Sequence, residues 1–289
     1  MRAIRNHYDP YLQVFNRLEH YLVIGQNPNK VELIVMGGTF PALTEEYQTT
    51  FVHDAFKAMN DFSELFFKKN DLDFEKFKDF FELPGDIASK ERTEKIHAKV
   101  LIIKSSNQKN LEYEQKRNES SAIRCVALCV ETKPDWAKLS EGNRMLLQGC
   151  TRVEVGIESI YDDVLTKTHR GHSSADTKES FQILRDLGFK ISAHYMPGLP
   201  LTNKERDLDG MKELFSNSDY RPDMLKIYPC MVSPGTALYQ EWKKGTFKPQ
   251  TTEEAASLIA EFKPFIPEYC RVQRINRDVP TKFWSAGVG

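Results

Sequence analysis

The chain has 289 residues, 40% of them hydrophobic, so it can bury one large core or the cores of two ordinary domains. Its 40 Lys and Arg residues against 41 Asp and Glu residues give a net charge of -1, which excludes a positive field over the whole molecule and leaves only a local basic patch for nucleic acid. The sequence has no apolar run of membrane-spanning length and a polar start, so we expect a cytoplasmic protein without a signal peptide or membrane span.

The cysteines predict no metal site. Cys125, Cys129, Cys150, Cys230 and Cys270 form no C-x-x-C pair and no zinc-finger spacing. Four of them lie in or beside apolar runs that predict strands. We therefore expect buried, reduced thiols of an intracellular protein rather than metal ligands.

The first part of the chain predicts a helix, a strand and a second helix. Apolar residues at helical spacing predict helices over 10–24 and 45–59, and the apolar run at 31–40 predicts the strand between them. From 61 to 122, charges of both signs alternate with phenylalanines at helical spacing. This pattern predicts a solvated helical insertion with one apolar strand at 100–103.

Strands and helices alternate again after the insertion. Apolar, β-branched runs predict four more strands, at 123–135, 151–159, 191–200 and 224–232. The helices expected between them cover 140–148, 173–187 and 203–215. Alternation of this kind predicts an α/β fold with a parallel sheet. Because five strands are too few to close a barrel, we expect an incomplete parallel (β/α) barrel.

The remaining residues predict a C-terminal extension. Helices are expected at 237–243 and 251–265, followed by an extended tail with alternating apolar positions. We therefore divide the chain into a partial barrel over 1–232, which includes the insertion 61–122, and an extension over 233–289.

Polar and glycine residues gather where the predicted strands end. Gly37 and Gly38 follow the first strand, Glu131 and Glu158 lie near the ends of the second and third, and His194 lies within the fourth. Ligands of parallel α/β sheets bind at the carboxyl ends of the strands. A glycine pair exposes amides to a carboxylate or phosphate, and a carboxylate suits a ribose hydroxyl or an amino group. The alternatives are a tight turn, helix capping and a core histidine, respectively.

Three arginines recur at every third position near the C-terminus. Arg271, Arg274 and Arg277 stand beside Gln273 and Asn276. Guanidinium groups with interleaved amides suit contacts with nucleic-acid phosphates. A solvated, charged strand has the same pattern, so the residues alone leave both interpretations open.

Several segments, taken in order, resemble the radical S-adenosylmethionine domain of the catalytic subunit of Elongator. They include M-R-A-I-R-N-H-Y-D-P-Y-L-Q, K-V-E-L-I-V-M-G-G-T-F, C-V-E-T-K-P-D, G-C-T-R-V-E-V-G-I-E-S-I-Y-D-D-V, A-H-Y-M-P-G-L-P, L-K-I-Y-P and R-I-N-R-D-V-P. The resemblance extends over the whole chain apart from 61–122. It implies an incomplete barrel of the radical SAM type and an enzyme that modifies wobble uridine 34 of tRNA.

The resemblance also implies the reaction and its cofactors. In the family, a [4Fe-4S] cluster cleaves S-adenosylmethionine, and the resulting radical takes hydrogen from the acetyl group of acetyl-CoA. The acetyl carbon then adds to C5 of the uridine, which gives carboxymethyluridine. The family has three N-terminal cysteines for the cluster and a C-terminal acetyltransferase domain, and neither is found here. We therefore expect a fragment of a larger enzyme that holds no cluster and is inactive alone.

Individual residues take their expected cofactor roles from the resemblance. Gly37 and Gly38 match the turn that receives the methionine end of S-adenosylmethionine. Glu131 and Glu158 match carboxylates near its ribose and amino group. Lys30 matches a lysine that the family associates with acetyl-CoA.

Catalytic and tRNA-binding residues follow in the same way. His194, Lys226 and Tyr228 are expected to face the active cavity. Arg271 and its two companions match a basic element expected to touch the backbone of the tRNA anticodon stem-loop. Elongator-type subunits or a second copy of the chain are the expected protein partners.

Two other functions remain open at this stage. In an aldolase-like barrel without a cluster, Lys226 would form a Schiff base with the substrate. In a non-catalytic tRNA-binding or assembly module, the basic element would act without turnover.

Overall fold

The chain divides into two units in the computed structural model, which describes residues 2–86, 89–106, 108–277 and 283–288. The first unit, here called the helical unit, comprises Met1–Ile34 and Leu43–Leu128. The second, here called the sheet unit, comprises Val35–Ala42 and Cys129–Gly289. The division at residue 232 that the sequence suggested remains a prediction.

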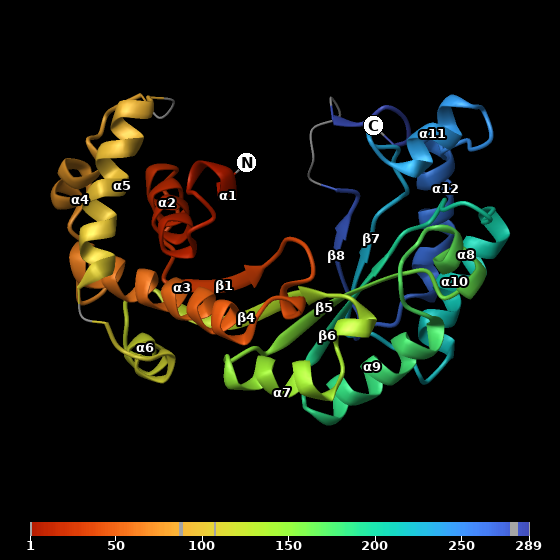
Figure 1. Cartoon of the computed structure of the whole chain (residues 1–289), viewed down its shortest axis with the longest axis horizontal. Coiled ribbons are helices and arrows are strands. Elements are labelled where there is room, and N and C mark those ends of the chain that lie inside the picture. Colours follow the sequence, from red (N-terminus) through yellow and green to blue (C-terminus); the bar gives the residue numbers. More distant parts are fainter. Residues whose placement is uncertain (1, 87–88, 107, 278–282, 289) are drawn as a thin grey trace. The chain divides into compact units, whose positions relative to one another are not determined.

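Helices and one short hairpin build most of the helical unit (Figure 1). The helices are α1 (Arg2–Arg5), α2 (Pro10–Val23), α3 (Glu45–Phe66), α4 (Phe74–Phe81), α5 (Lys90–Ser105) and α6 (Leu111–Asn118), and the hairpin strands are β2 (Phe67–Lys68) and β3 (Asp71–Leu72). The expected helices at 10–24 and 45–59 are confirmed as α2 and α3, and α3 continues into the insertion. Asp9 caps α2 by accepting a hydrogen bond from the Leu12 amide, and Pro10 stands at the first helical position, where it needs no amide partner.

Phenylalanines of the insertion form a buried aromatic cluster. Phe62, Phe66, Phe77 and Phe81 are fully buried. The ring centroids of Phe62 and Phe66 lie 4.7 Å apart in an edge-to-face arrangement, and those of Phe77 and Phe81 lie 4.9 Å apart. The expectation of a solvated elaboration is therefore wrong for these side chains, although the insertion is helical as expected.

The strand expected at 100–103 is also wrong. These residues continue α5, in which Ile96 and Val100 are buried one helical turn apart. An apolar run of this length is too short to show whether it has the period of a strand or of a helix. The helix formed by the charged residues before it therefore continues through it.

Six strands form the main sheet. They are β1 (Lys30–Val35), β4 (Arg124–Thr132), β5 (Arg152–Glu158), β6 (Lys190–Tyr195), β7 (Met224–Ile227) and β8 (Arg271–Ile275), in the order β1-β4-β5-β6-β7-β8. The pairings from β4 through to β8 are parallel. The expected α/β class and incomplete parallel barrel are confirmed. The extended tail supplies a sixth strand, β8, which the count of five had left out.

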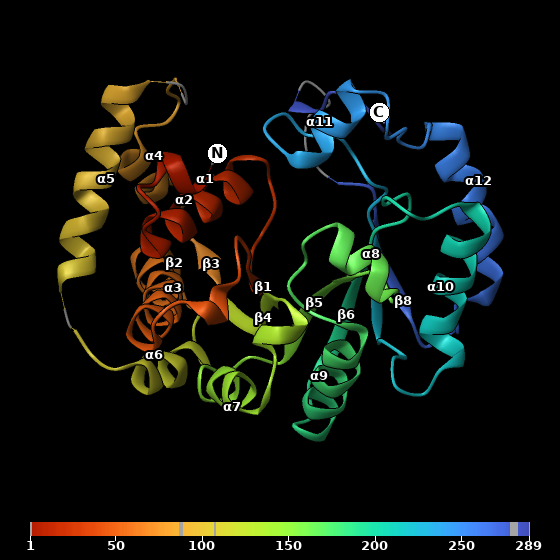
Figure 2. The same cartoon turned by 45° about the vertical axis from the view of Figure 1, so that its right-hand side comes forward.

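Most of the helices of the sheet unit lie along one side of its strands (Figures 1 and 2). They are α7 (Leu139–Leu147), α8 (Asp162–Lys167), α9 (Ser174–Asp186), α10 (Lys204–Ser216), α11 (Ala237–Lys243) and α12 (Thr252–Phe262), with short 3-10 turns at Phe40–Ala42, Pro134–Trp136 and Lys263–Phe265. In α9, Phe181 and Leu184 are fully buried where the helix packs on β6. None of the helices in the described part of the chain has the length and apolar character needed to cross a bilayer.

Candidate functional site

A row of charged side chains crosses one face of the sheet. Glu131 on β4 pairs in register with Glu154 on β5, His194 on β6 pairs with Lys226 on β7, and Lys226 pairs with Arg274 on β8. The β5 residue opposite His194 lies two positions after Glu154. Since paired residues and residues two apart project to the same face, these five side chains share one face. We call them the charged row.

The opposite face of the same strand is apolar. Val153, Val155 and Ile157 alternate with the charged positions of β5 and are fully buried. An apolar layer on both faces is the usual pattern of a parallel sheet covered on both sides. Burying charges instead costs desolvation energy that an apolar layer would avoid. The charged row is therefore better explained by function than by stability.

Glu154 is the centre of the charged row. Its carboxylate is fully buried and accepts hydrogen bonds from Arg152 Nη2 at 3.0 Å, from His194 Nε2 at 3.2 Å and from Lys226 Nζ. Burial alone would raise the pKa of Glu154, but the hydrogen bonds from His194 and Lys226 outweigh it and lower the pKa to about 2. The carboxylate is therefore ionised at neutral pH and holds three basic side chains in place.

His194 lies between two carboxylates. Its Nε2 is 3.2 Å from Glu154, and its Nδ1 is 3.5 Å from Glu131 Oε1. A neutral imidazole has one N–H, so only the doubly protonated ring can donate toward both carboxylates. The side chain of Glu131 is 30% exposed, which connects the buried part of the charged row to the surface.

Tyr228 joins Arg277, which follows β8, to the charged row. Its ring meets the ring of His194 edge-on, with centroids 5.4 Å apart, and the guanidinium carbon of Arg277 lies 5.1 Å from its centroid. Burial raises the pKa of Tyr228, so its hydroxyl stays protonated. The structure thus brings the three expected catalytic residues together with Glu131 and Arg277. Arg271 and Arg274 are exposed on β8.

Glu158 ends β5 in an unusual conformation. Its φ angle is 61°, in the left-handed region, at an irregularity in the pairing of β5 with β6. One carboxylate oxygen, Oε1, accepts a hydrogen bond from Arg170 Nη2 at 3.3 Å. The other, Oε2, is buried and has no partner among the described residues.

Other buried polar atoms near the ends of β4 and β5 also lack partners in the described part of the chain. They are Asp135 Oδ1, Arg170 Nε and His172 Nδ1. His172 Nε2 lies 3.2 Å from the carbonyl oxygen of Ile157, and burial lowers the pKa of this histidine. Buried polar atoms are rarely left unpaired. This set contains donors and acceptors, so it suits a ligand that itself carries both.

Gly37 and Gly38 follow β1 in the left-handed region. Their φ angles are 115° and 63°, and a Cβ added to either would meet no atom within 4 Å. Glycine is required here by the backbone conformation rather than by crowding. Both glycines are exposed, which agrees both with a tight turn and with a ligand-binding turn.

Lys30 belongs to the other unit of the chain. It is the exposed first residue of β1 in the helical unit. With Tyr21, Gln26 and Glu32 it lines a surface hollow of about 390 Å³.

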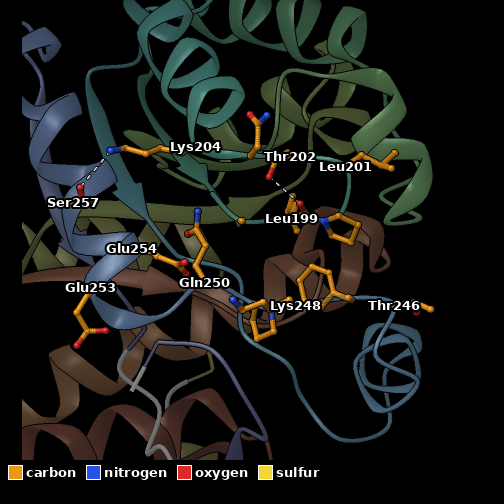
Figure 3. A pocket seen from close by; sticks show the side chains of 15 residues that line it. Leu199, Leu201, Thr202, Lys204, Thr246, Lys248, Gln250, Glu253, Glu254 and Ser257 are labelled. Carbon is orange, nitrogen blue, oxygen red and sulfur yellow. Dashed lines mark hydrogen bonds between the residues drawn. The ribbon is translucent and has the colours of Figure 1, made fainter.

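A hollow elsewhere in the sheet unit is a different feature (Figure 3). Its volume is about 680 Å³, and its walls are residues 198–204, residues 246–250 and the start of α12. Gln250 packs against Gly198, where an added Cβ would lie 2.9 Å from the Gln250 side chain. None of the residues that the sequence singled out lines this hollow.

The cysteines in the structure are separate thiols. All five are free, and within residues 2–86, 89–106, 108–277 and 283–288 no group of three or more His, Cys, Asp or Glu side chains is arranged to hold a metal ion. Burial raises the pKa of Cys150 and of Cys230 to about 12. Since metal binding requires thiolates, these thiols are poor ligands.

Sequence comparison finds relatives along the whole chain. It is 40% identical over 288 residues to the tRNA uridine(34) acetyltransferase of Methanocaldococcus infernus, covering 100% of this chain and 46% of the relative. It is 36% identical over 289 residues to human Elongator complex protein 3, again covering 100% of this chain and 45% of the relative. The chain thus spans about half the length of the curated relatives it matches.

Solved structures agree with these relatives. The archaeal Elp3 of Methanocaldococcus infernus with an N-terminal deletion (1-46) matches with a TM-score of 0.80 and 40% identity, covering 98% of this chain and 56% of that one. Coproporphyrinogen III oxidase (HemN) from Escherichia coli, a radical SAM enzyme, matches with a TM-score of 0.50 and 14% identity, covering 93% of this chain and 47% of that one. The second match concerns the fold alone.

Two family descriptions match consecutive parts of the sequence. The Radical SAM superfamily matches residues 85–210, and the Radical_SAM C-terminal domain matches residues 222–288. A radical SAM domain implies S-adenosylmethionine and a [4Fe-4S] cluster. The described cysteines do not fit the cluster, whereas the unpartnered oxygen of Glu158 fits a cofactor with amino and hydroxyl donors. The chain therefore contains a radical SAM domain followed by a radical SAM C-terminal domain.

Proposed function

We propose that the chain is the radical SAM part of an enzyme that converts wobble uridine 34 of tRNA to carboxymethyluridine with acetyl-CoA as co-substrate. The observation that carries the proposal is the charged row, because its buried charges are better suited to holding a polar substrate than to stabilising a core. Relatives named tRNA uridine(34) acetyltransferase, at 40% identity over the whole chain, supply the substrate class.

S-adenosylmethionine would be held where β1, β4 and β5 end. The amides of Gly37 and Gly38 would receive its carboxylate, and the unpartnered oxygen of Glu158 would accept from its amino group or ribose. Glu131 is the second carboxylate at this edge. When bound, this cofactor supplies the group that takes hydrogen from an unactivated carbon.

The charged row would orient the substrate beside that cofactor. Lys226 and His194 present N–H donors fixed by Glu154, and Tyr228 adds a hydroxyl that stays protonated. Donors fixed in advance stabilise developing negative charge on oxygen without reorganisation. These side chains would therefore bind and orient the substrate, with His194 placed between Glu131 and the buried carboxylate.

The tRNA would be positioned by Arg271, Arg274 and Arg277. All three are exposed, and Arg277 already lies over Tyr228 of the site. Phosphate contacts position an RNA without reading its sequence, so uridine 34 would be selected only after the base leaves the stack. Lys30 is proposed to pair with a phosphate of acetyl-CoA. The reaction would take place in the cytoplasm, with Elongator-type subunits or a second copy of the chain as partners.

The test is to replace Glu158 by Gln in the native gene and to quantify wobble nucleosides in total tRNA by mass spectrometry. We expect carboxymethyluridine and its derivatives to be lost. Glu119→Gln, at an exposed residue paired with Lys116 in the helical unit, is the control and should leave them unchanged. Normal levels in the Glu158→Gln strain would reject the proposal.

A tRNA-binding module without turnover is the second candidate. It is favoured by the observation that the described cysteines do not fit an iron–sulfur cluster. In that case the purified chain binds the anticodon stem-loop, but the Glu158→Gln strain keeps its modified nucleosides. The two functions are therefore separated by the same experiment.

An aldolase-like lyase is disfavoured by the contacts of Lys226. Its ammonium forms an ion pair with Glu154, and an ammonium has no lone pair with which to attack a carbonyl. Trapping of a carbonyl substrate on Lys226 by borohydride would support this alternative.

A further inference from the structure

Lys226 is a buried cation with unused donors. It is 7% exposed, and Glu154 is its one hydrogen-bond acceptor among the described residues. An ammonium has three N–H donors and no acceptor. A buried donor without a partner is costly, so a ligand oxygen is the natural partner for the remaining N–H groups.

Glu154 fixes the direction in which Lys226 points. The lysine side chain is a flexible four-carbon stem, and a single contact at its end selects one of its many conformations. Glu154 Oε2 makes that contact and is shared with His194, while Oε1 is held by Arg152. With both of its oxygens engaged and no exposed surface, the carboxylate has no freedom to turn.

We propose that Lys226 recognises the 4-oxo group of the uracil at position 34, and that Glu154 is the positioning residue that aims it. The inference rests on the proposed function and specifies how its substrate is selected. Uracil presents an oxygen at position 4, which accepts a hydrogen bond, whereas cytosine presents an amino group there, which donates. An ammonium can only donate. It therefore pairs with uracil and faces a second donor in cytosine.

The experiment compares two anticodon stem-loops that differ only in having uridine or cytidine at position 34. Their dissociation constants for the purified chain are measured by fluorescence anisotropy at one fixed salt concentration. We expect a preference for uridine of about tenfold or more, since a hydrogen bond to a charged donor is lost with cytidine. Lys226→Met and Glu154→Gln should bring the ratio close to one, and Glu154→Asp should restore part of it.

Glu114→Gln is the matched control. Glu114 is a 1% exposed carboxylate in the helical unit, ion-paired with Arg117 at 3.0 Å. Its replacement removes a buried charge of the same kind and should leave the ratio as in the wild type. Folding of every variant is checked by circular dichroism. If Glu154→Gln does not fold, Lys226→Met and Glu154→Asp still show whether the ratio of the two dissociation constants depends on these side chains.

Each outcome has one meaning. Equal binding of both stem-loops by the wild-type chain overturns this inference but leaves the proposed tRNA function in place. A uridine preference that persists in folded Lys226→Met overturns it as well. Binding of neither stem-loop by the wild-type chain rejects the proposed function, and the inference falls with it. A ratio lost in both Lys226→Met and Glu154→Gln but kept in Glu114→Gln supports the inference.

Discussion

Each unit of the molecule contains one buried carboxylate surrounded by three donors. In the helical unit, Asp61 accepts from the hydroxyl of Tyr11 at 2.5 Å and from Lys57 Nζ at 2.6 Å, and pairs with Arg117 Nη1 at 2.7 Å. In the sheet unit, Glu154 is surrounded by Arg152, His194 and Lys226. By burial and partner count the two are alike.

Their surroundings differ. Lys57 lies 5.5 Å from the ring centroid of Tyr11, so its ammonium has a second partner within the helical core. No such ring faces Lys226 among the described residues, and the charged row continues to the partly exposed Glu131. A buried ion pair alone therefore does not identify a site. What distinguishes a site is hydrogen-bond donors that have no partner within the protein.

The largest expected effect is one that the two carboxylates share. Asp61→Asn and Glu154→Gln should each lower the free energy of unfolding by about 3 kcal/mol, because each leaves buried cations without their counter-charge. Urea denaturation of the two variants measures this. If one of the two substitutions leaves the free energy of unfolding unchanged, the two carboxylates are not equivalent, because the one that was replaced does not hold its partners.

The contribution of Glu154 to the loss of stability in acid should be measurable separately. Its pKa falls from 4.5 unfolded to about 2 folded, so its stabilisation is present above pH 4.5 and is lost as the pH falls toward 2. The expected loss is about 3 kcal/mol. Unfolding free energies measured between pH 5 and pH 2 should therefore fall less steeply in Glu154→Gln than in the wild type. Equal slopes would contradict the lowered pKa.

A smaller effect should appear in cofactor affinity. Glu158→Gln keeps the shape of the side chain but removes the negative charge of the carboxylate that contains the unpartnered oxygen. We therefore expect S-adenosylmethionine to bind about tenfold more weakly. Isothermal titration calorimetry measures this directly. Asp61→Asn, far from the strand ends in sequence, serves as the comparison and should bind like the wild type at a temperature where it is folded.

The smallest expected effect concerns the arginines. Arg274→Glu and Arg277→Glu should each weaken binding of several different stem-loops by a similar factor, several-fold at low salt and less as salt rises. Lys109→Glu, which makes the same change in net charge in the helical unit, should leave affinity unchanged. Unaltered affinity in both arginine variants at both salt concentrations would mean that β8 has only a solvated charged face.

Much of the sheet unit follows from the sequence, because strand and helix periods differ clearly there. The runs at 151–159 and 191–200 became β5 and β6, and 237–243 became α11 to the residue. The tail was recognised as extended, but not as a strand of the sheet, since pairing with β7 depends on a distant partner that local pattern does not contain.

Glu154 shows what sequence reasoning overlooked. The interpretation of T-R-V-E-V-G-I-E-S considered only the glutamate at the end of the strand, where ligands usually bind. The alternation of Arg152, Glu154, Gly156 and Glu158 with apolar residues was present in the same letters and indicated a charged face. Its partners on β6 and β7 could not be known, because register across a sheet is set by packing. The roles assigned to the individual site residues remain predictions.

Among the described residues, β1 and β8 form the two edges of the main sheet, and both carry charges. Lys30 and Glu32 lie on β1, and Arg271 and Arg274 lie on β8, where most of the strand is exposed. An unpaired strand edge invites other chains to add to it, and charged side chains on the edge discourage this. Replacing the β8 arginines by valine would leave an apolar edge prone to aggregation, whereas glutamate keeps the edge charged. Solubility, as much as the proposed RNA binding, therefore constrains which residues this strand can accept.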